Sequence, residues 1–140
     1  MTESTLADKH AIEELIARYN HAIDALQMDV WLDLWTDDAV FDGIGKYLVG
    51  KTAITEFADG YEKNYARRMP GGRHFTTNIA STVVGDHATA RSYLQLWSTD
   101  ANGARIAFTG VYDDVLVKQD GRWRFAGRKM VQDKPPKPPL

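Results

Sequence analysis

The sequence predicts an α+β domain, a conical half-barrel in which N-terminal helices pack over one face of a strongly curved antiparallel sheet and enclose a pocket. The first half of the chain carries apolar residues at helical spacing, and the second half carries long β-rich segments separated by turn dipeptides. A length of 140 residues fits one domain. We expect this domain to span residues 1–134 and a proline-rich tail to occupy residues 135–140.

Helices are expected in the first half. From Ile12 to Leu26, apolar residues recur at the i, i+3, i+4, i+7 spacing of an amphipathic helix, with Asp8 or Thr5 as its cap. A short helix that is capped by Asp29 and includes Trp35 should follow, and a hairpin of residues 39–42 and 46–49 comes next. Thr52 is expected to cap a third helix that ends before Pro70.

An antiparallel meander is expected from residue 73 onward. The dipeptides Gly85-Asp86, Asn102-Gly103 and Asp120-Gly121 predict hairpin turns between strands near residues 74–84, 88–99, 104–118 and 122–131. Strands of this length twist and coil strongly, and bulges are expected at Gly110 and Gly127. A curved sheet closed on one side by helices favours a cavity for a small apolar ligand.

Composition excludes several function classes. The net charge of −2 gives no basic surface for nucleic acid or for an anionic membrane, and no apolar run reaches the length of a membrane span. We therefore expect a cytoplasmic protein with neither nucleic acid nor membrane as a partner. The chain has no cysteine, and its four histidines lack metal-ligand spacing, so no cofactor and no metal are expected.

His74 is the strongest candidate catalytic residue. It opens the first long strand and shares strand parity with Thr76 and Asn78, a polar combination for a sheet interior. A histidine at a cavity wall is a common general base, whereas the alternative is a histidine with a purely structural hydrogen bond. Asp24 ends the first helix and is either a solvated carboxylate or the group that orients the imidazole.

Further residues are candidates for contact with a substrate. Asp42, which precedes Gly43, is either a residue that favours a turn or a catalytic base. Arg128 is expected to face a polarised or anionic substrate group. The expected aromatic walls are Trp31, Tyr47, Phe57, Tyr61, Tyr93 and Trp97. Tyr93 and Trp97 fit equally well, together with Arg91 and Gln95, on a contact surface between subunits, and only one of these placements can hold.

Four motifs carry a family resemblance. They are Ile12-x-x-Leu-Ile-x-x-Tyr19-x-x-x-x-Asp24, Leu34-Trp-Thr-Asp-Asp-Ala-Val-Phe41, Arg73-His74-x-x-x-Asn78 and Gly121-Arg-Trp-Arg-Phe-x-x-Arg128. Together they resemble the SnoaL-like branch of the nuclear transport factor two-like superfamily over about residues 8–131. That superfamily has a conical α+β barrel around one pocket, and its members include isomerases, dehydratases, cyclases, hydrolases and binding proteins.

The resemblance implies roles for individual residues. Asp24 and His74 match the Asp–His pair of scytalone dehydratase, lindane dehydrochlorinase and bile-acid dehydratase, in which the histidine removes a proton and the aspartate orients it. Tyr19 resembles the tyrosine that acts on the substrate oxygen in bile-acid dehydratase. Arg128 matches an arginine of the dehydrochlorinase.

Two classes of function follow. The first is a cofactor-independent lyase or isomerase that removes a carbon-bound proton from a small hydrophobic cyclic substrate, leading to dehydration, dehydrohalogenation or a double-bond shift. The second is a binding or carrier domain that uses the same pocket without chemistry. The resemblance also implies a homo-oligomer, a dimer or trimer formed through the outer face of the sheet.

Overall fold

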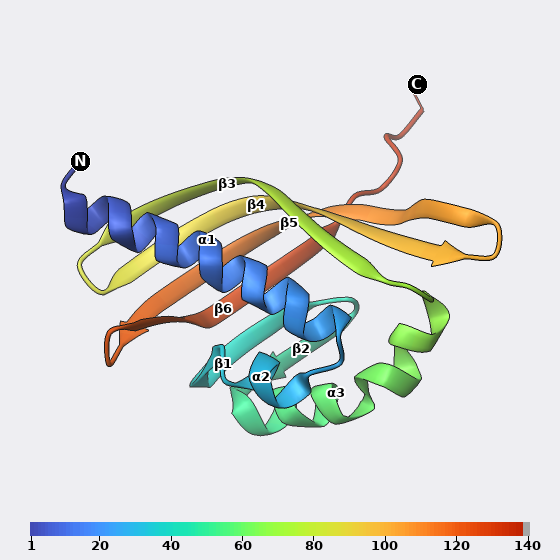
Figure 1. Ribbon diagram of the computed structural model, residues 1–140, viewed down its shortest axis with the longest axis horizontal. Helices are drawn as coiled ribbons and strands as arrows, with labels where there is room; N and C mark the ends of the chain where they lie inside the picture. Colours follow the sequence, from blue (N-terminus) through green and yellow to red (C-terminus); the bar gives the residue numbers. More distant parts are fainter. Residues whose placement is uncertain (139–140) are drawn as a thin grey trace.

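The computed structural model describes residues 1–138 and has the predicted order of helices and strands (Figure 1). The elements are α1 (Glu3–Asp24), α2 (Met28–Leu32), β1 (Trp35–Gly43), β2 (Lys46–Val49), α3 (Gly50–Asn64), the 3₁₀ turn η1 (Ala66–Arg68), β3 (Arg73–Val84), β4 (His87–Asp100), β5 (Gly103–Gln119) and β6 (Arg122–Gln132). The prediction of an α+β fold with N-terminal helices is confirmed.

The strands form one sheet in the order β2-β1-β6-β5-β4-β3. From β3 to β6, consecutive strands pair antiparallel with each other, which confirms the meander. The hairpin β1–β2 joins the meander through a parallel pairing of β1 with β6. Trp35, expected in a helix, instead begins β1, where it pairs with Phe125.

Strand irregularities bend the sheet so that it curves around α1 without closing (Figure 1). Pairing passes from Leu96–Phe108 to Trp97–Ile106 and from Val115–Gly127 to Leu116–Phe125, which leaves one extra residue on β5 and one on β6. The bulge on β6 adjoins Gly127, close to the predicted position, whereas the bulge on β5 lies at Ala107 and not at the predicted Gly110. Gly110 allows a close approach of strands instead, because a Cβ there would lie 2.7 Å from the carbonyl oxygen of Val131.

Helix α1 crosses the concave face of the sheet (Figure 1). Its predicted apolar stripe is buried from Ile12 to Ile23, and Thr2 caps the helix in place of the predicted Thr5 or Asp8. Polar side chains fix the helix to strands: Asp8 accepts from the indole of Trp123, and Asn20 donates to Thr76. These contacts place the C-terminal end of α1 beside the beginning of β3.

Helices α2 and α3 cover the end of the sheet near β1 and β2 (Figure 1). Trp31 of α2 is fully buried, with its ring centroid 5.3 Å from that of Trp35 and 5.5 Å from that of Tyr19. Helix α3 buries Ile54, Ala58 and Tyr61. An aromatic layer therefore fills the space between the helices and the sheet.

The last strand ends at Gln132, and residues 133–138 form neither helix nor strand. The predicted tail spans residues 135–140, of which 139–140 lie outside the described residues. Within residues 1–138, no helix is both long and apolar enough to cross a membrane.

Candidate functional site

Asp24 and His74 meet where the end of α1 passes the start of β3. The imidazole Nδ1 lies 2.6 Å from Asp24 Oδ1, and the backbone N–H of His74 donates to Asp24 Oδ2 at 3.0 Å. Both side chains are about nine-tenths buried. Because Asp24 contacts both the ring and the backbone N–H of His74, the carboxylate and the imidazole are held in a fixed orientation, with Nδ1 facing the carboxylate. The other ring nitrogen, Nε2, is left for a ligand.

The segment before β3 holds His74 in place. The Pro70 carbonyl accepts from the backbone N–H of Thr99 and from the hydroxyl of Ser98, both at 2.9 Å. Gly71 has a φ of +59°, and a Cβ there would lie 2.9 Å from the Thr99 carbonyl oxygen. The predicted turn at Pro70 thus fixes the loop against β4 and sets where β3 begins.

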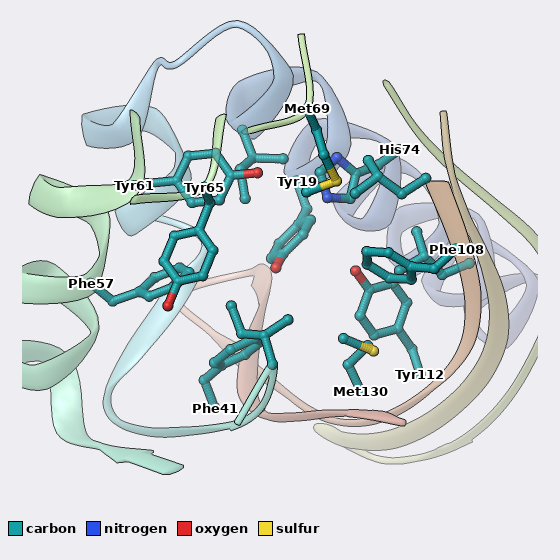
Figure 2. Close-up of a pocket in the computed structure, with 14 residues that line it drawn as sticks. Tyr19, Phe41, Phe57, Tyr61, Tyr65, Met69, His74, Phe108, Tyr112 and Met130 are labelled. Atoms are coloured by element: carbon teal, nitrogen blue, oxygen red, sulfur yellow. The ribbon is translucent and has the colours of Figure 1, made fainter. Parts of the chain in front are cut away.

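His74 lines a cavity between the concave face of the sheet and the helices (Figure 2). Its enclosed space is small, about 60 Å³. Aromatic and aliphatic side chains dominate the lining. The residues are Tyr19, Ile23, Phe41, Ile44, Phe57, Tyr61, Tyr65, Met69, His74, Leu94, Leu96, Phe108, Tyr112 and Met130.

A wider, more polar cleft adjoins this cavity. Ile23, Tyr61, Met69, His74 and Leu96 line both, so the imidazole stands where the cleft meets the apolar cavity. The cleft also includes Asp24 and the loop of residues 71–73. The geometry gives a ligand a route from solvent past His74 into the apolar interior.

Two buried tyrosines form part of the cavity wall. The side chains of Tyr19 and Tyr112 are 3% exposed, and their hydroxyls point into the cavity (Figure 2). Burial raises the pKa of Tyr19, and the positive charge of Arg128 acts in the opposite direction. Burial also raises the pKa of Tyr112 well above its ordinary value. Both groups therefore stay protonated and can donate hydrogen bonds at neutral pH.

Arg128 lies behind these rings. Its guanidinium donates to both carboxylate oxygens of Asp114, at 2.8 and 3.1 Å, and its central carbon lies 3.6 Å from the Tyr112 ring centroid and 4.3 Å from that of Tyr19. Both side chains of the ion pair are fully buried. Burial is the largest single influence on the guanidinium and lowers its pKa, but Asp114, Tyr112 and Tyr19 together outweigh it, so the net pKa is raised.

The structure brings together part of the predicted site. Tyr19, His74, Phe57 and Tyr61 line one cavity, and Asp24 holds the imidazole at its edge. Their expected catalytic and binding roles remain predictions. Among residues 1–138, no group of three or more His, Cys, Asp or Glu side chains is arranged to hold a metal ion.

Two predicted substrate contacts lie behind the cavity wall. Arg128 was expected to face the substrate, but its charge is neutralised by Asp114 and its guanidinium is covered by the rings of Tyr19 and Tyr112. Trp31 was expected in the wall, but it belongs to the core layer behind Tyr19. Neither residue is part of the cavity lining given above.

Three further contacts are corrected by the course of the strands. Asn78 has a φ of +55° at a bulge in β3, which turns it away from the face that His74 shares and leaves it exposed. Tyr47 is 69% exposed on the edge strand β2. Asp42 follows Phe41 on β1, so strand alternation directs Asp42 to the face opposite the cavity.

Tyr93 and Trp97 lie on the outer face of the sheet. Their neighbours Leu94 and Leu96 point inward and line the cavity, and Tyr93 is 51% exposed. The wall assignment for Tyr93 and Trp97 is therefore wrong, while the alternative placement on an outer contact surface is compatible with the structure.

Sequence reasoning missed Tyr112 and its buried support. Tyr112, Asp114 and Leu116 alternate along β5 and are all buried. A charged residue at an inward-facing strand position, between two large apolar residues, is a sign of a buried polar site. Its partner could not be identified without the register that pairs Asp114 with Arg128.

Comparisons with known proteins agree with this fold. The sequence model of the SnoaL-like domain family matches residues 4–129. Rv3472, a protein of unknown function from Mycobacterium tuberculosis, is 34% identical over 94% of this chain and 75% of its own, with a TM-score of 0.83.

Two structures from Novosphingobium aromaticivorans are also similar. A candidate aromatic ring hydroxylase is 32% identical over 93% of this chain and 92% of its own, with a TM-score of 0.78. A candidate scytalone dehydratase is 25% identical over 96% and 89%, with a TM-score of 0.81. A comparison with curated proteins finds no match.

Proposed function

The chain belongs to the SnoaL-like domain family, and from this premise we propose that it is a cofactor-independent lyase or isomerase acting on a small hydrophobic cyclic substrate. The observation that carries the proposal is the 2.6 Å contact between His74 Nδ1 and Asp24 Oδ1 at the edge of an apolar cavity. Similarity to a candidate scytalone dehydratase supports a dehydratase-like reaction.

His74 acts as the general base in this proposal. Its Nε2 takes a proton from a substrate carbon, and the C–H electron pair forms a new double bond. In a dehydrohalogenation, halide leaves with the electron pair of its own bond; in a dehydration, the hydroxyl group leaves with that pair and takes a proton from the imidazolium to become water. In an isomerisation, the proton returns at another carbon. Asp24 accepts the hydrogen bond from Nδ1 and stabilises the imidazolium, and a positioned base supplies about 10²–10⁴ in rate.

The cavity supports this chemistry in two ways. Aromatic walls such as Phe57 and Tyr61 exclude water, which strengthens the attraction between the carboxylate and the imidazolium. Tyr19 presents a protonated hydroxyl to a substrate oxygen. The small apolar space favours a compact ring over a long polar ligand.

Deuterium exchange tests the base without knowledge of the natural substrate. We expect the protein to accelerate incorporation of deuterium beside the carbonyl of small cyclic ketones, such as 2-tetralone, in D₂O, as measured by mass spectrometry. His74→Ala should lower this acceleration by about 10²-fold or more, since the base is gone. Asp24→Asn should lower it by a smaller factor, because the imidazole remains.

Controls separate catalysis from folding. Asp42→Asn should exchange at the wild-type rate, since Asp42 does not line the cavity. Thermal unfolding of His74→Ala should occur near the wild-type temperature, and His74→Gln provides a second variant of similar size. If the ketones bind and are recovered without enhanced exchange, the protein is a binding domain and the proposal is wrong.

A further inference from the structure

The turn of the β1–β2 hairpin holds a residue that its backbone conformation disfavours. Ile44 and Gly45 form this two-residue turn and have φ values of +47° and +73°. Positive φ at both positions favours Asn, Asp or Gly at the first one, and the β5–β6 turn has Asp120 there, with a φ of +51°. Within residues 1–138, Ile44 is the only β-branched residue with a positive φ. Its side chain therefore raises the conformational energy of the turn.

The place of Ile44 in the cavity wall accounts for this choice of residue. Ile44 lines the cavity together with Phe41 of the same hairpin, and 36% of it is exposed. Gly43 lets the turn approach the wall, since a Cβ there would lie 3.1 Å from the Cβ of Met130 and 3.2 Å from the ring of Phe41. In Figure 2, Phe41 and His74 lie on opposite sides of the cavity. The hairpin therefore closes the cavity on the side away from the imidazole.

The hairpin is lightly anchored to the rest of the sheet. Strand β2 has four residues and lies at the edge of the sheet beside β1 (Figure 1). Three of its side chains are exposed, while Leu48 is partly buried. A short edge strand with few buried side chains opens at a low free-energy cost.

The size of the cavity requires a part of its wall to move. The enclosed space of about 60 Å³ is well below the roughly 150 Å³ of a protein cavity that admits benzene. A ring is therefore accommodated when a wall element shifts outward. The lightly anchored β1–β2 hairpin is suited to this movement, because its turn carries a lining side chain.

We propose that the β1–β2 hairpin is a lid over the cavity and that Ile44 sets how far a bound ring system can extend from His74. The lid moves outward to make room for the ring and then closes with the Ile44 side chain against the far end of the ring. This inference deepens the proposed function and rests on it for its role in turnover. The substrate class is a compact ring system whose reacting C–H bond lies at His74 and whose opposite end is apolar.

Two aromatic probes of different length test the role of Ile44. Fluorine NMR titrations of the full chain with fluorobenzene and with 2-fluoronaphthalene give two dissociation constants. Ile44→Gly removes the side chain and keeps the turn, since glycine adopts positive φ without strain. We expect the ratio of affinities to shift toward 2-fluoronaphthalene by about tenfold, because the second ring can occupy the space that the side chain leaves. Ile44→Ala should shift the ratio in the same direction.

Val49→Ala provides a matched control for these titrations. Val49 is a β-branched residue of the same hairpin, but it is 61% exposed and is not among the residues that line the cavity, so the ratio should keep its wild-type value. An unchanged ratio in Ile44→Gly, or the same shift in Val49→Ala, overturns the role of Ile44.

Urea denaturation tests the strained turn on which the inference depends. Ile44→Gly should be more stable than Ile44→Ala by about fivefold in the ratio of folded to unfolded protein, because alanine retains the cost of positive φ. Equal stability of the two variants would contradict the positive φ and reject the inference.

Amide hydrogen exchange, measured by mass spectrometry, tests the movement of the lid. Exchange in residues 43–49 should slow by about tenfold when fluorobenzene is present at ten times its dissociation constant, because the ligand binds the closed form. The β5–β6 turn at Asp120 also has positive φ but does not line the cavity, so its exchange should not change. Equal exchange of residues 43–49 with and without fluorobenzene would reject the lid.

These results do not depend on catalysis. His74→Ala should retain the slowed exchange of the hairpin, since the lid is intact. Failure of the cyclic-ketone experiment together with a shifted affinity ratio in Ile44→Gly would reject the proposed base and keep the lid. Enhanced exchange in the ketones with an unchanged affinity ratio would keep the base and reject the lid.

Discussion

Asp113 and Asp114 are adjacent in sequence and form ion pairs on opposite faces of the sheet. Asp114 and Arg128 are fully buried, whereas Asp113 and Arg91 are each at least half exposed. Their arginine–oxygen distances begin at 2.8 and 3.1 Å, so geometry alone would rank the pairs as similar. The two pairs nevertheless differ in energy. Water screens the charges of the outer pair, whereas a charge in the core that loses its partner has no solvent to replace it.

The buried pair gives a stability prediction. Asp114→Asn should lower the free energy of unfolding by about 3–5 kcal/mol, because the Arg128 charge is left buried without its counter-ion. Asp113→Asn should cost about 0–1 kcal/mol, since its pair is exposed. Urea denaturation followed by tryptophan fluorescence measures both. Equal losses in the two variants would contradict the assignment of a special role to the inner pair.

Residue identity alone could indicate only part of the site. Asp24 lies at the flank of its helical stripe, so periodicity did not select it, and the match to the Asp–His motif did. Tyr112 resembled an ordinary core residue until the β5–β6 register placed Arg128 against it. Asn78 was predicted to face inward because strand parity was counted without the bulge that reverses it.

At the scale of elements, α1 is fixed to the meander near both of its ends. Asp24 binds β3 at the C-terminal end, and Asp8 accepts from Trp123 Nε1 at 2.9 Å and from Lys118 Nζ at 3.0 Å near the N-terminal end. The hydrogen bond from Trp123 is the main cause that lowers the pKa of Asp8; the nearby Lys118 adds to it, and partial burial opposes it.

The lowered pKa predicts a pH-dependent contribution to stability. A carboxylate whose folded-state pKa lies below its unfolded value stabilises the fold above the unfolded pKa, and the contribution is lost as the pH falls through the folded pKa. Asp8→Asn should therefore cost about 1 kcal/mol at pH 7. The difference from wild type should shrink below about pH 4.

Thermal and urea unfolding from pH 7 to pH 2.5 measure this difference. Asp29 of α2, an exposed carboxylate in the first turn of its helix, provides a control, and Asp29→Asn should show a smaller effect. A constant gap between Asp8→Asn and wild type across the whole pH range would show that Asp8 stabilises the fold by packing and not by its charge.

Turn chemistry made most elements predictable. The three turn dipeptides lie at the junctions between the observed long strands, with Gly103 as the first residue of β5, and the apolar spacing of α1 predicted its buried face. The bulges were less predictable: the bulge on β6 adjoins Gly127, but the bulge on β5 lies beside Phe108 and not at Gly110. The parallel pairing of β1 with β6 depends on contacts between distant segments, which local patterns do not encode.

At the scale of the molecule, the two faces of the sheet differ in what covers them. Helices cover the concave face, while the outer face carries half-exposed apolar side chains, among them Phe75, Tyr93, Val115 and Val131. Isolated exposed apolar residues are ordinary, but a set spread over β3 to β6 on one face favours a contact surface. We propose that a second copy of the chain covers this outer face, as the family resemblance implies.

A stable interface requires about 800 Å² from each partner, roughly a tenth of the 8710 Å² surface of this chain. Sedimentation velocity at tens of micromolar should therefore show a dimer or trimer. Val115→Asp should shift the protein toward monomer by about tenfold or more in dissociation constant, because it places an unpaired charge within the contact.

Val84→Asp makes the same change at a residue that is 73% exposed beside the β3–β4 turn, and it should leave the assembly intact. A monomeric wild-type protein would show that no such contact exists. An assembly unaffected by Val115→Asp would show that the subunits meet through another surface.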